Sequence, residues 1–312
     1  MNLMIRPLER KDLPEANRIF RLAFGTFLNV PDPMSFSGDA EVVQTRWLAA
    51  PGTVLGAYRF GSLVGSSFAA NWGSFGVFGP LTVHPSLWDQ DIGRRLLEAN
   101  IELFEEWGVR QIGLFTFPDS PKHIALYQRF GFWPQYLTPL LCKSVTALTT
   151  PGWSRYSEIP VGERECCLSR CRSITDAVYP GLDLGSEIRS VALQDLGDTV
   201  LVYDGADLAG FAVCHLGAGS ESTTGTAYVK FGAVRPGASA ARYFSQLLLA
   251  CEALAGAHGL TQLLAGVNSA RRGAYQMMLE RDFRTVFLGT AMQRPDEPGY
   301  NRPDCFVMDD WR

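Results

Sequence analysis

The chain repeats its own pattern after 151 residues, and this period limits the folds that are open to it. Three pairs of equivalent residues share the spacing, because 236 − 85, 247 − 96 and 283 − 132 all equal 151: Pro85 and Pro236, Leu96 and Leu247, Phe132 and Phe283. A period of this size corresponds to a whole domain rather than to a short solenoid repeat. With 312 residues, the chain is also longer than one hydrophobic core usually supports. We therefore expect two copies of one domain, at residues 1–147 and 148–312.

The same order of elements is predicted in both halves. Two runs of β-forming residues, broken at Gly61-Ser62 and at Asp204-Gly205, are each followed by a third run that ends in a proline. A helix, a strand and a second helix follow, because apolar residues recur at helical spacing in RRLLEANIELFEEWG and YFSQLLLACEALAGAHG. The predicted fold class is α/β (α+β), with two tandem domains that each contain a mixed, mostly antiparallel sheet flanked by helices. Turn-forming residues in LTTPGWSRYSEIPVGERE, from Leu148, predict the linker.

Composition and charge narrow the classes of function. The net charge of −4 gives no basic surface for phosphates, so we expect a small-molecule partner and no nucleic acid. No apolar run approaches the roughly 18 residues of a membrane span, and the amino terminus lacks a signal-peptide pattern. We expect a cytoplasmic protein without membrane contact, as a monomer or homodimer. The seven cysteines lack paired CxxC spacing, which favours reduced thiols and no metal site.

The turn WDQDIGRRLL, from Trp88, joins the predicted strand that ends TVHP to the helix after it. The first N–H groups of a helix have no partner inside the helix and can bind a phosphate group. Arg94 and Arg95 lie just inside this helix, where their guanidinium groups suit phosphate oxygens. An ordinary turn before a helix is the alternative that this segment alone leaves open.

Two motifs in the first half carry a resemblance to a known family. One is Val83-His84-Pro85 followed by the loop Trp88-Asp89-Gln90-Asp91-Ile92-Gly93, and the other is the helix end Leu126-Tyr127-Gln128-Arg129-Phe130-Gly131-Phe132. They resemble the signatures V-x-P, Q/R-x-x-G-x-G/A and A-x-x-L-Y-x-x-x-G-F of the Gcn5-related N-acetyltransferase (GNAT) family. The departures are Trp88 for Gln or Arg, Asp91 for the first glycine, His123 for the Ala and Ser120 for an Asn before it.

The resemblance implies a site for acetyl-CoA and a role for each matching position. The backbone of Leu81, Thr82 and Val83 would line the pantetheine, and the turn from Asp89 to Arg94 would hold the pyrophosphate. Tyr127 would be the general acid that protonates the departing sulfur. The implied cofactor-binding residues are Leu81, Thr82, Val83, Trp88, Asp89, Gln90, Asp91, Ile92, Gly93, Arg94, Arg95 and Ser120.

The second half keeps the pattern of elements but not these residues. Phe244 stands at the position of Gly93, where its side chain would keep a pyrophosphate away from the backbone. Met278 stands at the position of Tyr127, which removes the acid. Tyr275, three positions earlier, is either a displaced substitute or an ordinary core aromatic. We therefore expect a degenerate coenzyme site in the second half.

The general base and the acceptor site stay open at this stage. His84 is either a titratable group near the reaction or a solvent-facing residue, and the carboxylates of Asp32, Asp39 and Glu41 either meet the acceptor or belong to a solvated loop. His215, Tyr228 and Glu221 are candidates that the sequence does not rank, for a cleft between the copies. The tail CFVMDDWR, from Cys305, alternates like a closing strand.

The predicted function is transfer of an acetyl group from acetyl-CoA to a primary amine of a small molecule; a non-catalytic sensor of acyl-CoA or a metabolite is the alternative.

Overall fold

The computed structural model describes residues 3–146 and 151–312, so residues 148–150 of the predicted linker lie outside the described part. The helices are α1 (Leu13–Phe27), α2 (Val42–Ala49), α3 (Ile92–Glu106), α4 (Pro121–Gln128), α5 (Arg164–Val178), α6 (Gly185–Gln194), α7 (Ala240–Ala257) and α8 (Arg272–Glu280). The strands are β1 (Leu3–Pro7), β2 (Val54–Arg59), β3 (Ser62–Trp72), β4 (Phe75–Val83), β5 (Gln111–Thr116), β6 (Trp133–Ser144), β7 (Trp153–Arg155), β8 (Gly197–Asp204), β9 (Asp207–Leu216), β10 (Thr226–Val234), β11 (Gln262–Gly266), β12 (Arg284–Arg294) and β13 (Val307–Asp309).

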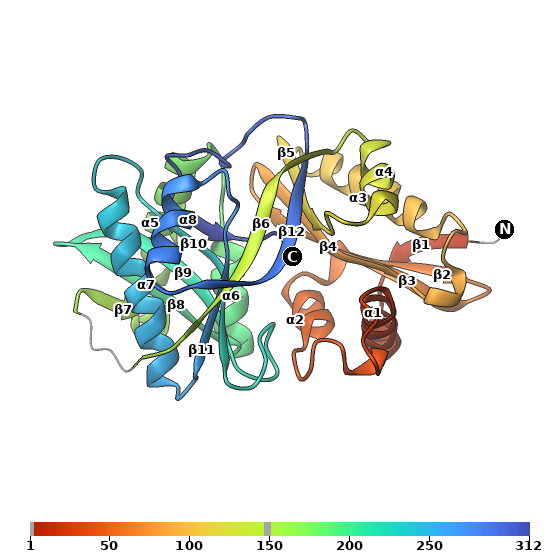
Figure 1. Ribbon diagram of the computed structural model, residues 1–312, viewed down its shortest axis with the longest axis horizontal. Coiled ribbons are helices and arrows are strands. Elements are labelled where there is room, and N and C mark those ends of the chain that lie inside the picture. Colours follow the sequence, from red (N-terminus) through yellow and green to blue (C-terminus); the bar gives the residue numbers. More distant parts are fainter. Residues whose placement is uncertain (1–2, 147–150) are drawn as a thin grey trace.

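The described strands form one sheet in the order β1-β2-β3-β4-β5-β12-β6-β11-β10-β9-β8-β7, with β13 paired to β10. Within the described ranges, only the pairs β4·β5 and β10·β11 are parallel. In the first half, α3 and α4 lie on one side of the strands and α1 and α2 on the other (Figure 1). The predicted fold class, a mixed α/β structure with a mostly antiparallel sheet flanked by helices, is confirmed. None of the helices in the described part combines the length and the apolar character that crossing a bilayer requires.

The two halves exchange strands where they meet, which the sequence did not predict. β12 of the second half lies between β5 and β6, and β6 in turn pairs with β11 (Figure 1). Thr290 of β12 stands opposite Thr116 of β5 on one side and Leu137 of β6 on the other. A hydrophobic cluster also crosses the junction, where the rings of Trp72 and Phe231 lie 5.8 Å apart. Backbone pairing and core packing thus join the halves.

β4 and β5 pair along only part of their length. Their parallel register joins Phe75–Val77 to Gln111–Gly113, whereas β4 continues to Val83. The other side of β4 stays paired with β3 as far as Val83 opposite Gly65. Residues 78–83 therefore present a backbone edge toward β5 that no described strand occupies. We call this segment the open edge of β4.

The equivalent edge in the second half is occupied. β10 pairs with β11 from Thr226 to Val229, as β4 pairs with β5. Beyond that point β10 pairs with the tail instead, with Phe231, Gly232 and Ala233 opposite Asp309, Met308 and Val307. The tail thus forms the closing strand that its alternation predicted.

Candidate active site

The open edge of β4 begins the candidate site. Thr82 and Val83 bury their side chains, at 3% and 8% exposed, while Leu81 is half-buried between two hydrophobic clusters. Their side chains thus anchor the strand on both faces, and their backbone groups on the β5 side have no strand partner among the described residues. An unpaired strand edge offers N–H and C=O groups to an amide-containing chain. Pantetheine, which contains two amides, fits this requirement.

The turn before α3 has the backbone shape that a phosphate cradle needs. Asp89 and Asp91 are left-handed, with φ of 62° and 65°, a conformation that Asp tolerates better than most residues. Asp91 is the N-cap of α3, yet its side chain makes no capping hydrogen bond. The carboxylate therefore leaves the first helical N–H groups available for an anion.

Gly93 lies in the first turn of α3, facing β4. A Cβ placed there would meet only methyl groups of Leu81 and Val83, at 3.8 and 3.9 Å. These are ordinary van der Waals distances, so the surrounding chain tolerates a methyl group at this position. A side chain the size of Phe would extend past these methyl groups toward the open edge. A larger side chain at Gly93 is therefore expected to interfere with a bound ligand without straining the fold.

Charged side chains around the turn are paired with one another. Arg94 contacts Asp91 at 3.2 Å and Glu98 at 2.5 Å, and Lys122 contacts Asp89 at 2.5 Å. These pairs are exposed and contribute little stability, so the cations can turn toward a phosphate at low cost. The predicted positive charge at Arg94 is thus shared with two carboxylates when no anion is bound.

The remaining predicted residues of the turn hold it against the strands. The Trp88 indole donates to the Val83 carbonyl at 2.8 Å, and Gln90 accepts from Arg59 at 2.7 Å. Ile92 is buried in the core, at 3% exposed, so only its backbone can reach a ligand. Arg95 is half-exposed and lies 3.5 Å from Glu98.

Tyr127 lies at the end of α4 with its ring in the core. The ring is 8% exposed, and its centroid lies 6.1 Å from that of Phe78 and 6.4 Å from that of Phe132. Burial raises the pKa of Tyr127 to about 12. The hydroxyl is therefore a weaker acid than that of an ordinary tyrosine, whose pKa is about 10. Its hydroxyl keeps its proton throughout the physiological pH range.

Ser120 and His123 lie earlier on α4. Ser120 is the buried N-cap of the helix and makes no side-chain capping bond. The His123 Nδ1 atom is buried without a hydrogen-bond partner among the described residues. Burial lowers the pKa of His123, and the neighbouring Lys122 lowers it further, which keeps the ring neutral.

Four titratable residues that the sequence left open have local structural contacts. His84 caps the short helix Pro85–Leu87, because its Nδ1 accepts from the Ser86 N–H at 3.3 Å. Asp32 accepts from the Met34 N–H at 3.1 Å. Asp39 accepts from the backbone and hydroxyl of Thr224, and the Glu41 N–H donates to the Ser220 carbonyl at 2.7 Å. Asp39 and Glu41 thus join the α1–α2 segment to the second half.

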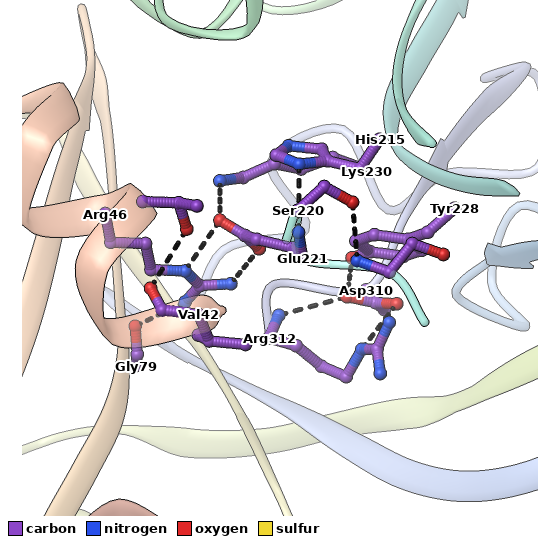
Figure 2. A network of polar contacts seen from close by, with 12 residues as sticks. Val42, Arg46, Gly79, His215, Ser220, Glu221, Tyr228, Lys230, Asp310 and Arg312 are labelled. Atoms are coloured by element: carbon purple, nitrogen blue, oxygen red, sulfur yellow. Dashed lines mark hydrogen bonds and ion pairs between the residues drawn. The ribbon is translucent and has the colours of Figure 1, made fainter. Parts of the chain in front are cut away.

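Residues from both halves form a buried polar network beside Gly79 (Figure 2). Glu221 accepts from Arg46 at 2.6 and 3.0 Å and from Lys230 at 2.6 Å. Arg46 also donates to the Gly79 carbonyl at 2.5 Å. His215 joins the network because its Nδ1 accepts from the Glu221 N–H at 3.2 Å. The fold therefore brings His215 and Glu221 to the boundary between the halves.

A second part of the network contains Tyr228 and the end of the chain. The Tyr228 hydroxyl donates to Asp310 at 3.0 Å, and the Arg312 guanidinium lies over the Tyr228 ring at 4.6 Å (Figure 2). The sequence analysis missed Arg46, Lys230 and Arg312 as site candidates, and it placed Asp310 only at the end of the predicted closing strand. The one sequence signal was Lys230, a charge in the middle of the apolar strand AYVKFGAV.

No cluster of three or more His, Cys, Asp or Glu side chains in the described part is placed to hold a metal ion. For a coenzyme, three features of the first half fit together: the open edge of β4, the uncapped start of α3 and the space at Gly93. The phosphate groups fit the helix start, and the pantetheine amides fit the strand edge.

Comparison with known proteins agrees with this geometry. Residues 17–132 match the model of the acetyltransferase (GNAT) family. The structure of a proposed acetyltransferase from Pyrococcus horikoshii has a TM-score of 0.70 at 14% identity and covers 100% of this chain and 95% of that one. A GCN5-related N-acetyltransferase from Sphaerobacter thermophilus has a TM-score of 0.60 at 13% identity, with 94% and 95% covered. A tandem GNAT protein from the clavulanic acid biosynthesis pathway has a TM-score of 0.57 at 14% identity, with 94% and 98% covered.

These likenesses define the chain as a protein with the tandem acetyltransferase fold. No curated protein matches the sequence at a significant level. Within the first half, the match to the acetyltransferase (GNAT) family model includes the open edge of β4.

Proposed function

We propose that this protein is an N-acetyltransferase that transfers the acetyl group of acetyl-CoA to a primary amine of a small molecule. The observation that carries the proposal is the open edge of β4 beside the uncapped start of α3. Residues 1–147 form the half that binds the coenzyme, and residues 148–312 form a half whose equivalent edge is filled by β13.

The coenzyme would supply an acyl thioester, and the chain would hold it by the backbone. The backbone of Leu81, Thr82 and Val83 lines the pantetheine, with the Val83 carbonyl already accepting from the Trp88 indole, and N–H groups of the turn from Asp89 to Arg94 bind the pyrophosphate. Arg95 and Ser120 flank this path. Holding both reactants in place lowers the entropic part of the barrier.

Tyr127 Oη would provide the proton that the departing thiol needs. Its raised pKa means that the hydroxyl is always protonated at neutral pH. The buried polar network beside Gly79 offers no free carboxylate base. Burial alone would raise the pKa of Glu221, but Arg46 and Lys230 outweigh it and hold the pKa well below its ordinary value. The amine therefore enters in its neutral form.

A non-catalytic sensor of acyl-CoA or a metabolite is the second candidate, and one observation favours it. A tyrosine with a pKa of about 12 gives its proton to a thiolate, whose conjugate acid has a pKa of about 8.5, less readily than an unperturbed tyrosine does. The sensor would use the same coenzyme path without turnover.

Release of free thiol from acetyl-CoA with a panel of primary amines tests the proposal. We expect turnover by the native chain and a loss of about a hundredfold in kcat for Tyr127→Phe, at unchanged affinity for CoA. Tyr275→Phe, the same change on α8 of the second half, is the matched control and should be silent. Measurable CoA binding without turnover of any amine would favour the sensor, and equal loss from both variants would refute the role of Tyr127.

A further inference from the structure

A cavity of about 150 Å³ lies between the two halves, next to the start of the open edge of β4. α2, β3 and β4 of the first half line one side, including Val77 and Gly79, and α6, His215, Glu221 and Lys230 of the second half line the other. Drug-sized ligands occupy pockets of roughly 300–1,000 Å³. The cavity is therefore suited to a molecule of few atoms, and Gly79, which lines it, belongs to the open edge of β4.

The charged side chains of this cavity neutralise one another. Glu221 is bound by Arg46 and Lys230, and Lys230 also lies 3.2 Å from Glu187. The second Glu187 oxygen accepts from the Trp72 indole at 2.9 Å. Arg312, which also lines the cavity, is paired with Asp310 at 2.9 Å. The three cations of the lining are thus each paired with a carboxylate.

His215 is the exception, because one of its ring atoms has no partner. The Glu221 N–H donates to Nδ1 at 3.2 Å, so Nδ1 is unprotonated and the neutral ring carries its hydrogen on Nε2. Nε2 is buried and has no hydrogen-bond partner among the described residues. Burial lowers the pKa of His215 to about 4, against an opposing effect of Glu221, so the ring stays neutral. A buried donor without a partner is unfavourable unless something else accepts its hydrogen bond.

The remaining walls are mainly apolar. Side chains of Val54, Phe68, Ala69, Ala70, Val77 and Leu196 face the cavity. The polar side chains of Thr45, Thr53, Asn71 and Ser190 also line the cavity, and each has a hydrogen-bond partner within the chain. The buried, unpartnered Nε2 of His215 can orient a ligand through one oxygen atom, while the apolar walls pack the rest of it by contact. The donor comes from the second half, whereas the open edge of β4 belongs to the first.

We infer that this cavity binds the acceptor, and that the acceptor is a small primary amine whose own oxygen accepts a hydrogen bond from His215 Nε2. The inference rests on the proposed function, because it assigns the amine of that reaction. The second half then has a defined role: it no longer binds a coenzyme and instead selects the acceptor. Val64 stands at the equivalent position in the first half, because 215 − 64 equals the repeat of 151. Its side chain offers no hydrogen-bond donor.

Steady-state kinetics with isosteric amines tests the inference. Glycinamide and isobutylamine have the same shape, but only glycinamide carries an oxygen. For His215→Phe we expect KM for glycinamide to rise about ten- to a hundredfold. KM for isobutylamine and for acetyl-CoA should stay unchanged, and His215→Gln, which keeps a donor, should restore part of the affinity for glycinamide. An equal effect of His215→Phe on both amines would overturn the inference while the acetyltransferase activity stands.

Two further measurements separate the inference from the proposed function. Ser186 is exposed and lines the cavity, so Ser186→Trp narrows it without disturbing the core. We expect this variant to raise KM for glycinamide at unchanged CoA affinity, and no rise would count against the site. If the native chain acetylates neither amine, calorimetry of glycinamide binding decides: binding that His215→Phe abolishes supports the site, and no binding by the native chain overturns it.

Discussion

The open edge of β4 and the filled edge of β10 occupy equivalent positions in the two halves. Gly232 and Ala233 of β10 lie 151 residues after Leu81 and Thr82, and they pair with β13. In the first half, Leu81 and Thr82 pair with β3 on one side, and no described strand pairs with them on the side of β5. Unsatisfied strand edges are unfavourable, and proteins pair them or cover them. The second half therefore contains its own substitute for a bound ligand.

The tail also fills the space that the phosphate cradle would need. Phe306 packs its ring 5.5 Å from that of Phe244, the residue at the position of Gly93. Arg271, at the position of Ser120, is completely buried and contacts Asp309 of β13 at 2.7 Å. In the second half, these substitutions and the covering tail thus coincide at the position of the site proposed for the first half. Three predictions follow from this contrast, in order of decreasing effect.

Asp309→Ala should reduce the stability of the filled edge most. The change leaves the Arg271 guanidinium buried without its partner, which costs about 3–5 kcal/mol of unfolding free energy. Asp304→Ala is the matched control, because Asp304 is 78% exposed and should change stability by less than about 0.5 kcal/mol. Chemical denaturation measures both. A loss below about 1 kcal/mol for Asp309→Ala would contradict the role of the buried pair.

His215 should make the stability of the molecule depend on pH. Its folded pKa of about 4 lies below the unfolded value of about 6.5, so the unfolded chain binds more protons between these pH values. Stability is therefore lost as the pH falls from about 6.5 toward 4, by at most about 3 kcal/mol. His215→Phe should flatten this part of the curve of unfolding free energy against pH. An unchanged curve would show that His215 is not buried as a neutral ring.

Gln246 of the second half stands at the position equivalent to Arg95. The variant Arg95→Gln therefore gives the first half the residue of the second. Arg95 is half-exposed, so we expect a loss of only about three- to tenfold in CoA affinity, weaker at high salt. Arg242→Gln, an exposed arginine in the first turn of α7, should have no effect on CoA affinity. Equal losses from both variants would point to a general charge effect instead of a cradle.

Much of the difference between the open edge of β4 and the filled edge of β10 can be predicted from the sequence, because it depends on which residue stands at each position. Gly93 against Phe244 and Tyr127 against Met278 follow from the repeat alone, and the strand character of the tail follows from its alternation. The pairing of the tail with β10 could not be predicted, because an alternating pattern predicts a strand without predicting its neighbour.

The acceptor cavity was the part that the sequence could not assemble. Arg46 and Glu221 are 175 residues apart, and they meet because strand pairing and core packing join the two halves. The insertion of β12 between β5 and β6 leaves no trace in the local pattern of apolar and polar residues. His215 and Glu221 were recognisable as candidates, but their order of importance required the network of Figure 2.

Calorimetric titration with CoA compares the two equivalent positions, in the variants Gly93→Phe and Phe244→Leu. We expect Gly93→Phe to abolish binding, because the ring enters the coenzyme path, and Phe244→Leu to bind CoA as the native chain does. Retained binding by Gly93→Phe, or an equal loss in both variants, would contradict the division of labour between the two halves.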